Sequence, residues 1–347
     1  MRASVQGALR RVVTGGIAVL FLIELGVRIA THSLFLLGVD SDRYVTVDPM
    51  IGRIPKQGVA IHHPAGFEVS IGEHGTRNNR NPPLRREWPA ILAVGDSFTF
   101  GDQVNDSDSW PAVLERLLGR RVVNAGVPGF GLDQAVLRAE QLTQVYSPDT
   151  IVVSLIPHDV LRCQMSYWSG HPKPYFDING TELMLHPAPE RSGLHHAVLK
   201  RILSLSLTMD LLLPRFLHWE GPESVTVHAR GRDVACRLMD RLRTFAGARN
   251  IRIVVLAQPQ ASAPEAEHLE LKEGVLACAR ADGLPTLDLF PIVAGLPPKE
   301  RAKLFDRHMT VEGNRLVAAE LFALMNDSRD LPADGAPFTS PRVNSDH

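Results

Sequence analysis

Residues 90–101 read Ala90-Ile91-Leu92-Ala93-Val94-Gly95-Asp96-Ser97-Phe98-Thr99-Phe100-Gly101, and this stretch decides the fold. It begins as a continuous apolar run, breaks at a glycine, presents an acid and a serine, and closes on a second glycine. A short apolar run bounded by turn residues predicts a strand that is buried on both faces, as in a parallel sheet. A serine just beyond the C-terminal end of such a strand lies where open α/β sheets place their chemistry. Gly, Asp and Ser are also common in ordinary turns. Whether Ser97 belongs to a catalytic site therefore depends on other segments of the chain.

Strand-like and helix-like segments alternate after this stretch. Apolar runs predict strands at residues 91–94, 122–124, 150–155, 251–256 and 286–289, and helical patterns occupy residues 110–118, 134–145, 232–248, 265–281 and 311–325. Such alternation predicts a parallel sheet covered by helices on both faces. With right-handed crossovers, the expected fold class is α/β, a doubly wound, flavodoxin-like three-layer sandwich with a mainly parallel sheet.

The chain divides into four expected regions: a membrane anchor with its juxtamembrane segment (1–42), a small β-containing lead-in (43–88), the main domain (89–326) and a disordered tail (327–347). In the lead-in, Phe67, Val69 and Ile71 alternate with polar residues and should line one face of a strand. The run from Arg77 to Arg80 is interpreted as a solvated loop.

An insertion interrupts the main domain at about residues 163–225. It contains a predicted hairpin that turns at Asn179-Gly180. The leucine-rich stretch that follows, residues 194–219, is expected to form helices that cover the core; membrane-surface contact or an acyl pocket are the alternatives.

Composition narrows the function classes. The chain has 347 residues, 44% of them apolar and 22% charged, as expected of a globular protein with a sizeable core. Its net charge of -1 shows no excess of basic residues, which argues against nucleic acid as a partner. Cys163, Cys236 and Cys278 show neither metal-ligand spacing nor a disulfide framework, so each is expected to be a small buried hydrophobe.

The N-terminus predicts a membrane helix. Three arginines at positions 2, 10 and 11 precede an apolar segment, residues 12–30, which approaches the length of about 20 residues that spans a bilayer. Glu24 and Arg28 interrupt it four residues apart, where they can share a helix face. The arginines place the N-terminus in the cytoplasm and the rest of the chain outside it. A cleaved signal peptide is the alternative to this uncleaved anchor.

A serine hydroxyl needs a base that takes its proton and a carboxylate that orients the base. Both residue types occur just before the final predicted helix, where Asp306 and His308 stand two positions apart. In an extended loop their side chains point to the same side, so Asp306 could hold one ring nitrogen of His308 while the other faces Ser97.

Two further segments could stabilise a developing oxyanion. After the second predicted strand comes the glycine-rich run from Asn124 to Gly131, whose backbone N–H groups can approach a ligand closely. A helix-entry turn is the alternative, and a phosphate cradle is disfavoured because no Lys-Ser/Thr follows. After the third strand, His158 could be a third donor.

Together these segments resemble the SGNH, or GDSL, hydrolase family. The resemblance rests on Gly95-Asp96-Ser97, on the glycine loop that ends in Gly129, and on the pair Asp306 and His308. It covers roughly residues 90–325 and leaves the insertion outside. Thr99 occupies the last glycine position of the Gly-x-Ser-x-Gly elbow, which argues against the α/β-hydrolase family.

The resemblance implies that Ser97 is the nucleophile, His308 the general base and Asp306 the acid that orients it. It also implies that the N–H groups of Ser97 and Gly129 stabilise the oxyanion. The supporting positions in the matched motifs are Asp96, Asn124 and Asp159.

The chain departs from the family pattern at two positions. His158 stands where the family usually has asparagine, and its N–H could donate in the same way. Asp306 and His308 are one residue closer than in the usual Asp-x-x-His block, which is similar to membrane-associated polysaccharide O-acetyltransferases that use SGNH chemistry.

The expected function is therefore that of a membrane-anchored, extracytoplasmic esterase that works through an acyl-serine intermediate, without a metal or organic cofactor. Its substrate would be a small-molecule or glycan ester, with an O-acetyl or other short acyl group on a carbohydrate or lipid. One alternative is an O-acyltransferase that modifies a cell-surface polysaccharide. Another is a glycan-binding module that has lost catalysis.

Overall fold

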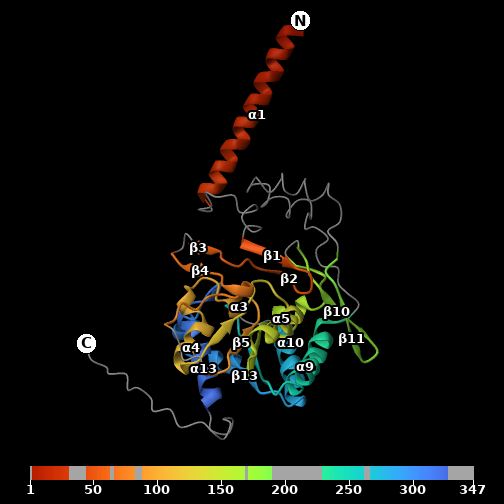
Figure 1. Cartoon of the computed structure of the whole chain (residues 1–347). Helices are drawn as coiled ribbons and strands as arrows, with labels where there is room; N and C mark the ends of the chain where they lie inside the picture. The colour runs from red at the N-terminus through yellow and green to blue at the C-terminus, as the bar shows by residue number, and fades with distance from the viewer. Residues whose placement is uncertain are drawn as a thin grey trace, which may run out of the picture.

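The structure of the chain is a computed structural model that describes residues 2–30, 44–62, 66–82, 88–168, 171–189, 229–261 and 266–326. Its centre is a five-stranded sheet with helices on both faces (Figure 1). The strands of this sheet are β5 (Ile91–Val94), β6 (Val122–Asn124), β7 (Thr150–Leu155), β12 (Arg252–Ala257) and β13 (Thr286–Asp288).

The strand order across the sheet is β13-β12-β7-β5-β6, and every neighbouring pair is parallel. Counted along the chain, this is the order 2-1-3-4-5 of flavodoxin-like sheets. The sequence-based prediction of an α/β fold with a mainly parallel sheet is thus confirmed. Strand β5 lies between β6 and β7, with Leu92 paired to Ile151, so its carboxyl end lies inside the sheet rather than at its edge.

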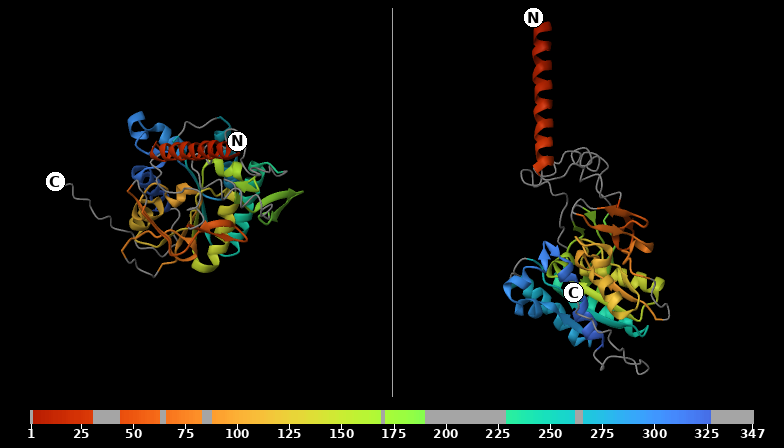
Figure 2. Two further views of the ribbon diagram at one scale, coloured as in Figure 1. Left: turned by 90° about the horizontal axis from the view of Figure 1, so that it is seen from above. Right: turned by 90° about the vertical axis from the view of Figure 1, so that its left-hand side faces the viewer.

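Two hydrophobic layers separate the sheet from its helices. Side chains alternate along β5: Leu92 and Val94 join the cluster on one face, and Ile91 and Ala93 join the cluster on the other. The first cluster includes side chains of α5 (Leu132–Tyr146), α9 (Gly231–Gly247) and α10 (Ala266–Ala281). The second includes side chains of α4 (Trp110–Leu118), α11 (Leu289–Gly295) and α13 (Val311–Asn326). Figure 2 shows these layers from two further sides.

Short elements connect the layers at the carboxyl ends of the strands. They are α3 (Ser97–Phe100), η2 (Asp106–Asp108), α6 (Pro157–Arg162), α12 (Pro298–Arg301), β14 (Phe305–Asp306) and β15 (His308–Met309). Local sequence explains where the longer helices stop and start. Helix α4 has Pro111 in its first turn and ends at Gly119, whose φ of 60° suits a glycine cap.

The lead-in forms two small antiparallel hairpins. They consist of β1 (Val45–Asp48) with β2 (Gly52–Pro55), and of β3 (Ala60–His62) with β4 (Glu68–Ser70), which the turn η1 (Glu73–Gly75) follows. Val69 and Ile71 are buried against Phe100, and Phe67 packs beside them, so the predicted apolar face is confirmed.

The expectation of a solvated loop from Arg77 to Arg80 is wrong for Arg77, which is only 2% exposed. Its backbone N–H donates to the carbonyl of Asn124 at 2.8 Å, which places it against the edge strand β6. Its guanidinium is surrounded by carbonyl oxygens and a carboxylate, and these partners make the burial of a cation possible.

The insertion contributes two hairpins to the part of the chain that the structure describes. They are β8 (Tyr167–Trp168) with β9 (His171–Pro172), and β10 (Tyr175–Asn179) with β11 (Glu182–His186). The second confirms the predicted turn, because Asn179 pairs with Glu182 and Gly180 has a φ of 60°. The leucine-rich stretch 194–219 and the tail 327–347 lie outside the described residues.

The N-terminal segment forms a long helix, α1 (Arg2–Ala30), on which Glu24 and Arg28 pair at 2.7 Å as their spacing predicts. Within the described residues, no helix combines the length and apolar character needed to cross a membrane. The membrane-spanning helix that the N-terminus predicts is therefore not found among them.

The cysteines differ from expectation. Cys236 on α9 and Cys278 on α10 form a disulfide with Cα atoms 5.3 Å apart, whereas Cys163 is a buried free thiol. The expectation of three small buried hydrophobes is wrong for the pair, because 42 residues separate the two in sequence and only the packing of α9 on α10 brings them together.

Candidate active site

The turn after β5 presents Ser97. Gly95 has a φ of 157°, and a Cβ there would lie 2.3 Å from Oγ1 of Thr99 and 2.8 Å from the carbonyl oxygen of Ser154. Only glycine fits this close approach. Asp96 caps α3, because its Oδ1 accepts the N–H of Phe98 at 2.8 Å. The turn therefore holds Ser97 as the first residue of α3, 8% exposed.

The structure brings Ser97 and His308 together. Nε2 of His308 lies 3.0 Å from Oγ of Ser97, within the range that proton transfer from a nucleophile to a base requires. His308 reaches this position from the hairpin β14–β15, which turns at Arg307 with a φ of 63°. Its ring packs on that of Phe98, with centroids 5.3 Å apart.

Two carboxylates lie near this histidine. Asp306 is the cross-strand partner of His308, so the two side chains share one face of the hairpin. It is exposed, and no hydrogen bond joins it to His308 among the described contacts. Asp102, which the sequence reasoning missed, has its Oδ2 at 3.8 Å from Nε2 of His308. The signal for it was an acid directly after Gly101, the glycine that closes the nucleophile motif.

Gln103 was also missed. Its Oε1 accepts the backbone N–H of His308 at 3.0 Å, although 205 residues separate the two. Gln103 has a φ of 71°, in the left-handed region that non-glycine residues rarely adopt. Nothing in its local sequence points to this contact, which depends on the placement of the β14–β15 hairpin.

Two backbone donors are free to meet an oxyanion. Among the residues that the structure describes, the N–H groups of Ser97 and Gly129 have no acceptor. Gly129 has a φ of 82°, and a Cβ there would lie 3.1 Å from the indole of Trp168. Asn124 supports the loop between the two donors, since it accepts the N–H of Gly126 at 3.2 Å and donates to the carbonyl of Phe100 at 3.1 Å.

The ring of His158 makes its described contacts away from these donors. Its Nδ1 lies 3.0 Å from Oε1 of Gln260, just after β12, and its ring is 4.7 Å from that of His268 on α10. Neither Ser97 nor Gly129 is among its contacts. The structure thus places His158 at the carboxyl end of the sheet without joining it to the Ser97–His308 pair, and its oxyanion role stays a prediction.

A buried charge network lies beneath the nucleophile turn. Nη1 of Arg162 donates to Asp159 at 2.6 Å and to the carbonyl of Phe130 at 2.8 Å, and it lies 3.6 Å from Asp96. Burial raises the pKa of Asp96, and Arg162 opposes this shift. Burial, followed by repulsion from Asp96, raises the pKa of Asp159 well above its usual range. One arginine therefore balances two carboxyl groups that flank the site, and its guanidinium also lies 4.5 Å from the ring centre of Trp168.

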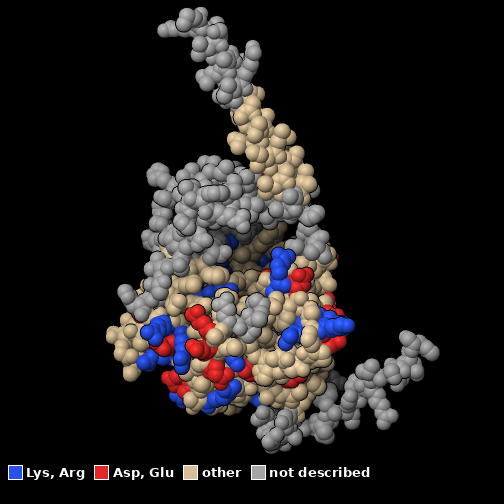
Figure 3. Space-filling model, turned by 180° about the vertical axis from the view of Figure 1, so that it is seen from behind, with Lys and Arg blue, Asp and Glu red and all other residues tan. Residues whose placement is uncertain are grey.

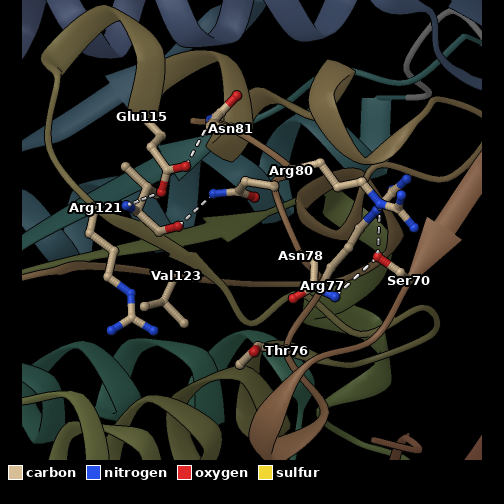
Figure 4. Close-up of a pocket in the computed structure, with 11 residues that line it drawn as sticks. Ser70, Thr76, Arg77, Asn78, Arg80, Asn81, Glu115, Arg121 and Val123 are labelled. Atoms are coloured by element: carbon tan, nitrogen blue, oxygen red, sulfur yellow. Dashed lines mark hydrogen bonds between the residues drawn. The ribbon is translucent and has the colours of Figure 1, made fainter. Parts of the chain in front are cut away.

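The described residues contain no group of three or more His, Cys, Asp or Glu side chains that could hold a metal ion. A polar cavity of about 480 Å³ lies beside β6, lined by Ser70, Thr76, Arg77, Asn78, Asn79, Arg80, Asn81, Glu115, Arg121, Val122 and Val123. Figure 4 shows Asn78 and Arg80 directed at Ser70 in this cavity, and Asn81 directed at Glu115. None of the predicted site residues lines it. On the face shown in Figure 3, acidic and basic side chains are interspersed.

A serine at the carboxyl end of a central parallel strand, with a histidine ring within hydrogen-bond distance from the last loop, is the arrangement typical of a serine hydrolase on a doubly wound sheet. The sequence model of the GDSL-like lipase/acylhydrolase family matches residues 93–316, and the chain belongs to this family. The protein is thus an SGNH-type serine hydrolase, as its motifs predict.

Solved structures with a similar fold share little sequence with this chain. A putative lipolytic protein of the G-D-S-L family from Desulfitobacterium hafniense DCB-2 is 16% identical, with 68% of this chain and 99% of that chain covered and a TM-score of 0.40. The lipase/acylhydrolase from Enterococcus faecalis is 14% identical, with 68% and 94% covered and a TM-score of 0.40. The acetyl xylan esterase AlAXEase is 12% identical, with 68% and 98% covered and a TM-score of 0.42. No curated protein matches the chain.

Proposed function

We propose that this hydrolase cleaves acyl esters through an acyl-serine intermediate, with Ser97 as nucleophile and His308 as general base. The observation that carries the proposal is the 3.0 Å approach of Nε2 of His308 to Oγ of Ser97 in a chain of this family. Asp306 shares the face of the hairpin with His308, and we assign its carboxylate to Nδ1 of this histidine. Catalytic hydrogen bonds of this kind often tighten only when substrate binds.

The reaction follows from these positions. His308 takes the hydroxyl proton as Ser97 attacks the ester carbonyl, and the N–H groups of Ser97 and Gly129 receive the oxyanion. When the tetrahedral intermediate collapses, His308 gives its proton to the leaving alcohol, and the acyl group stays on Ser97. Water then enters, His308 takes one of its protons, and the oxygen attacks the acyl carbonyl. When the bond between the acyl carbon and Oγ breaks, His308 returns its proton to Ser97 and the carboxylic acid leaves.

The proposed substrate is an ester of a short acyl group, such as acetyl, on a carbohydrate or lipid. The indole of Trp168 lies next to Gly129 and places a flat aromatic surface beside a proposed oxyanion donor. Transfer to a sugar hydroxyl instead of water would use the same residues in the first half-reaction. Adding a glycan acceptor to the assay separates the two, because a transferase would form a new glycan ester.

Replacing Ser97 tests the proposal. The Ser97→Ala variant should lose hydrolysis of p-nitrophenyl acetate by at least about 10³-fold, because it lacks the proposed nucleophile. A fluorophosphonate probe should modify the wild-type protein at Ser97 and leave the variant unmodified. Ser107→Ala is the matched control, since this hydroxyl, ten residues further along the chain, makes no hydrogen bond among the described residues. Full turnover by a folded Ser97→Ala protein would refute the proposal.

We also propose that the catalytic domain works outside the cytoplasm. The disulfide between Cys236 and Cys278 supports this location, because such bonds form and persist in oxidising compartments and are rare in the cytosol.

A further inference from the structure

The loop between α3 and η2 contacts His308 through two consecutive residues. Gln103 accepts the backbone N–H of His308 at 3.0 Å, and the carboxylate of Asp102 lies 3.8 Å from Nε2 on the same histidine. The loop therefore contacts both the backbone and the ring of the proposed base. Since Gln103 adopts a left-handed φ of 71°, this conformation persists only if neighbouring contacts hold it.

Three of those contacts come from Arg77, which lies in the lead-in, in addition to the backbone hydrogen bonds of the loop itself. Its Nη1 donates to the carbonyls of Phe100 at 2.8 Å and Gly101 at 2.5 Å, and its Nη2 donates to the carbonyl of Val104 at 2.6 Å. These carbonyls flank Asp102 and Gln103 on both sides. One guanidinium thus fixes the two ends of the segment that contacts His308.

The cation itself is held from the lead-in and from η2. The Arg77 side chain is fully buried, and its Nε donates to Oδ1 of Asp106 at 2.9 Å. The same carboxylate accepts the backbone N–H of Ser70 on β4 at 3.0 Å. Removing either partner of a buried arginine–carboxylate pair lowers the stability of the fold, since the other charge is left uncompensated.

We propose that Arg77 and Gln103 are positioning residues for His308, and that the lead-in is thereby part of the catalytic apparatus. The inference rests on the proposed function, because it assumes that His308 is the base. Arg77 lies outside residues 93–316, the part of the chain that matches the family model, whereas Gln103 and His308 lie within it. Arg77 fixes the loop, Gln103 fixes the backbone of His308, and the ring then stays within 3.0 Å of Ser97.

Two variants of Gln103 test whether this residue fixes the backbone of His308. Gln103→Ala removes the acceptor for the backbone N–H of His308. It should lower kcat for p-nitrophenyl acetate by about 10²-fold with KM unchanged, since displacing a catalytic group by about 1 Å has that effect. Gln103→Glu keeps an oxygen acceptor and should stay within about fivefold of wild type. The rate of fluorophosphonate labelling should follow kcat. A Gln103→Ala kcat within about twofold of wild type, or equal losses in both variants, would overturn the proposal.

Arg77→Lys tests whether Arg77 fixes the loop that contacts His308, and Arg80→Lys is the matched control. Both arginines pair with Asp106, but Arg80 is 54% exposed and its described contacts do not include the carbonyls of residues 100–104. Arg77→Lys should lower kcat and the labelling rate while a thermal melt shows a folded protein, and Arg80→Lys should change neither. Equal kcat in the two folded variants would overturn the role of Arg77, and if Arg77→Lys fails to fold, the Gln103 variants decide.

The two proposals fail separately. A wild-type protein that neither hydrolyses the ester nor reacts with the probe would refute the proposed function. A wild-type protein that does both, with Gln103→Ala unimpaired, would refute the positioning role alone.

Discussion

Two acids compete for the role of partner to His308. Asp306 shares a face of the β14–β15 hairpin with the histidine, and we assign it to Nδ1, the nitrogen that is not bonded to Ser97. Asp102 lies near Nε2, the nitrogen that already faces Ser97. A carboxylate at Nδ1 both orients the ring and stabilises the imidazolium, whereas one at Nε2 can only stabilise the charge.

We predict that Asp306→Asn lowers kcat by about 10²-fold to 10⁴-fold, as the loss of an orienting acid does in other serine triads. Asp102→Asn should cost about tenfold or less, because a carboxylate near Nε2 can stabilise the imidazolium charge but does not orient the ring. Steady-state kinetics with p-nitrophenyl acetate compare the two variants directly. A larger loss in Asp102→Asn would reverse the assignment and make Asp102 the principal acid.

At the scale of elements, the site depends on where strands end. All five strands run parallel, so their carboxyl ends lie at the same end of the sheet. Residues that are distant in sequence meet there because each follows a different strand. Ser97 follows β5, the glycine loop follows β6, and His308 comes from the hairpin before α13. On one face of this sheet, α9 and α10 are joined by the disulfide between Cys236 and Cys278.

We predict that the Cys236→Ser/Cys278→Ser protein loses about 2–4 kcal/mol of unfolding free energy, because the bond closes a loop of 42 residues in the unfolded chain. Chemical denaturation with and without reductant measures this loss. Alkylation of the denatured wild-type protein should modify one thiol, Cys163, before reduction and all three cysteines after it. Three reactive thiols before reduction would show that the bond does not form, and the proposed location outside the cytoplasm would lose its support.

At the scale of the whole molecule, a second buried arginine joins the lead-in to the main domain. Arg138 on α5 donates through Nε to the carbonyl of Ala125 at 2.8 Å and through Nη2 to the carbonyls of His74 and Gly75 at 3.1 and 3.0 Å. Burial lowers the pKa of Arg138 to about 10. Such a cation remains in the interior because it satisfies carbonyls from both parts of the chain.

We predict that Arg138→Ala lowers the unfolding free energy by about 3 kcal/mol, since three carbonyls, two of them buried, lose their donor. Gln141→Ala is the matched control on the same helix. It removes one half-buried hydrogen bond to Asp48 and should cost about 1 kcal/mol or less. Urea denaturation of both variants gives the two values. Equal losses would mean that Arg138 does not stabilise the junction more than an ordinary contact.

Much of this architecture could be predicted from the sequence, because its signals are local. Apolar runs and helical periodicity located β5, β6 and β7 to the residue, and placed the ends of β12, β13 and the main helices within two residues. The motif around Ser97 and the pair Asp306 and His308 identified the family for the same reason. Their residue types and spacings are unusual enough to be recognised without knowing any contact.

Only the tertiary structure decided the features that depend on contacts through space. Arg77 lies in a polar, loop-like run, and its burial follows from carbonyls and a carboxylate that lie 23 to 29 residues away. The contact of Gln103 with His308 spans 205 residues, and the disulfide spans 42. His158 pairs with Gln260, 102 residues away. Sequence patterns report the periodicity of one element at a time, whereas these contacts exist only once separate elements pack together.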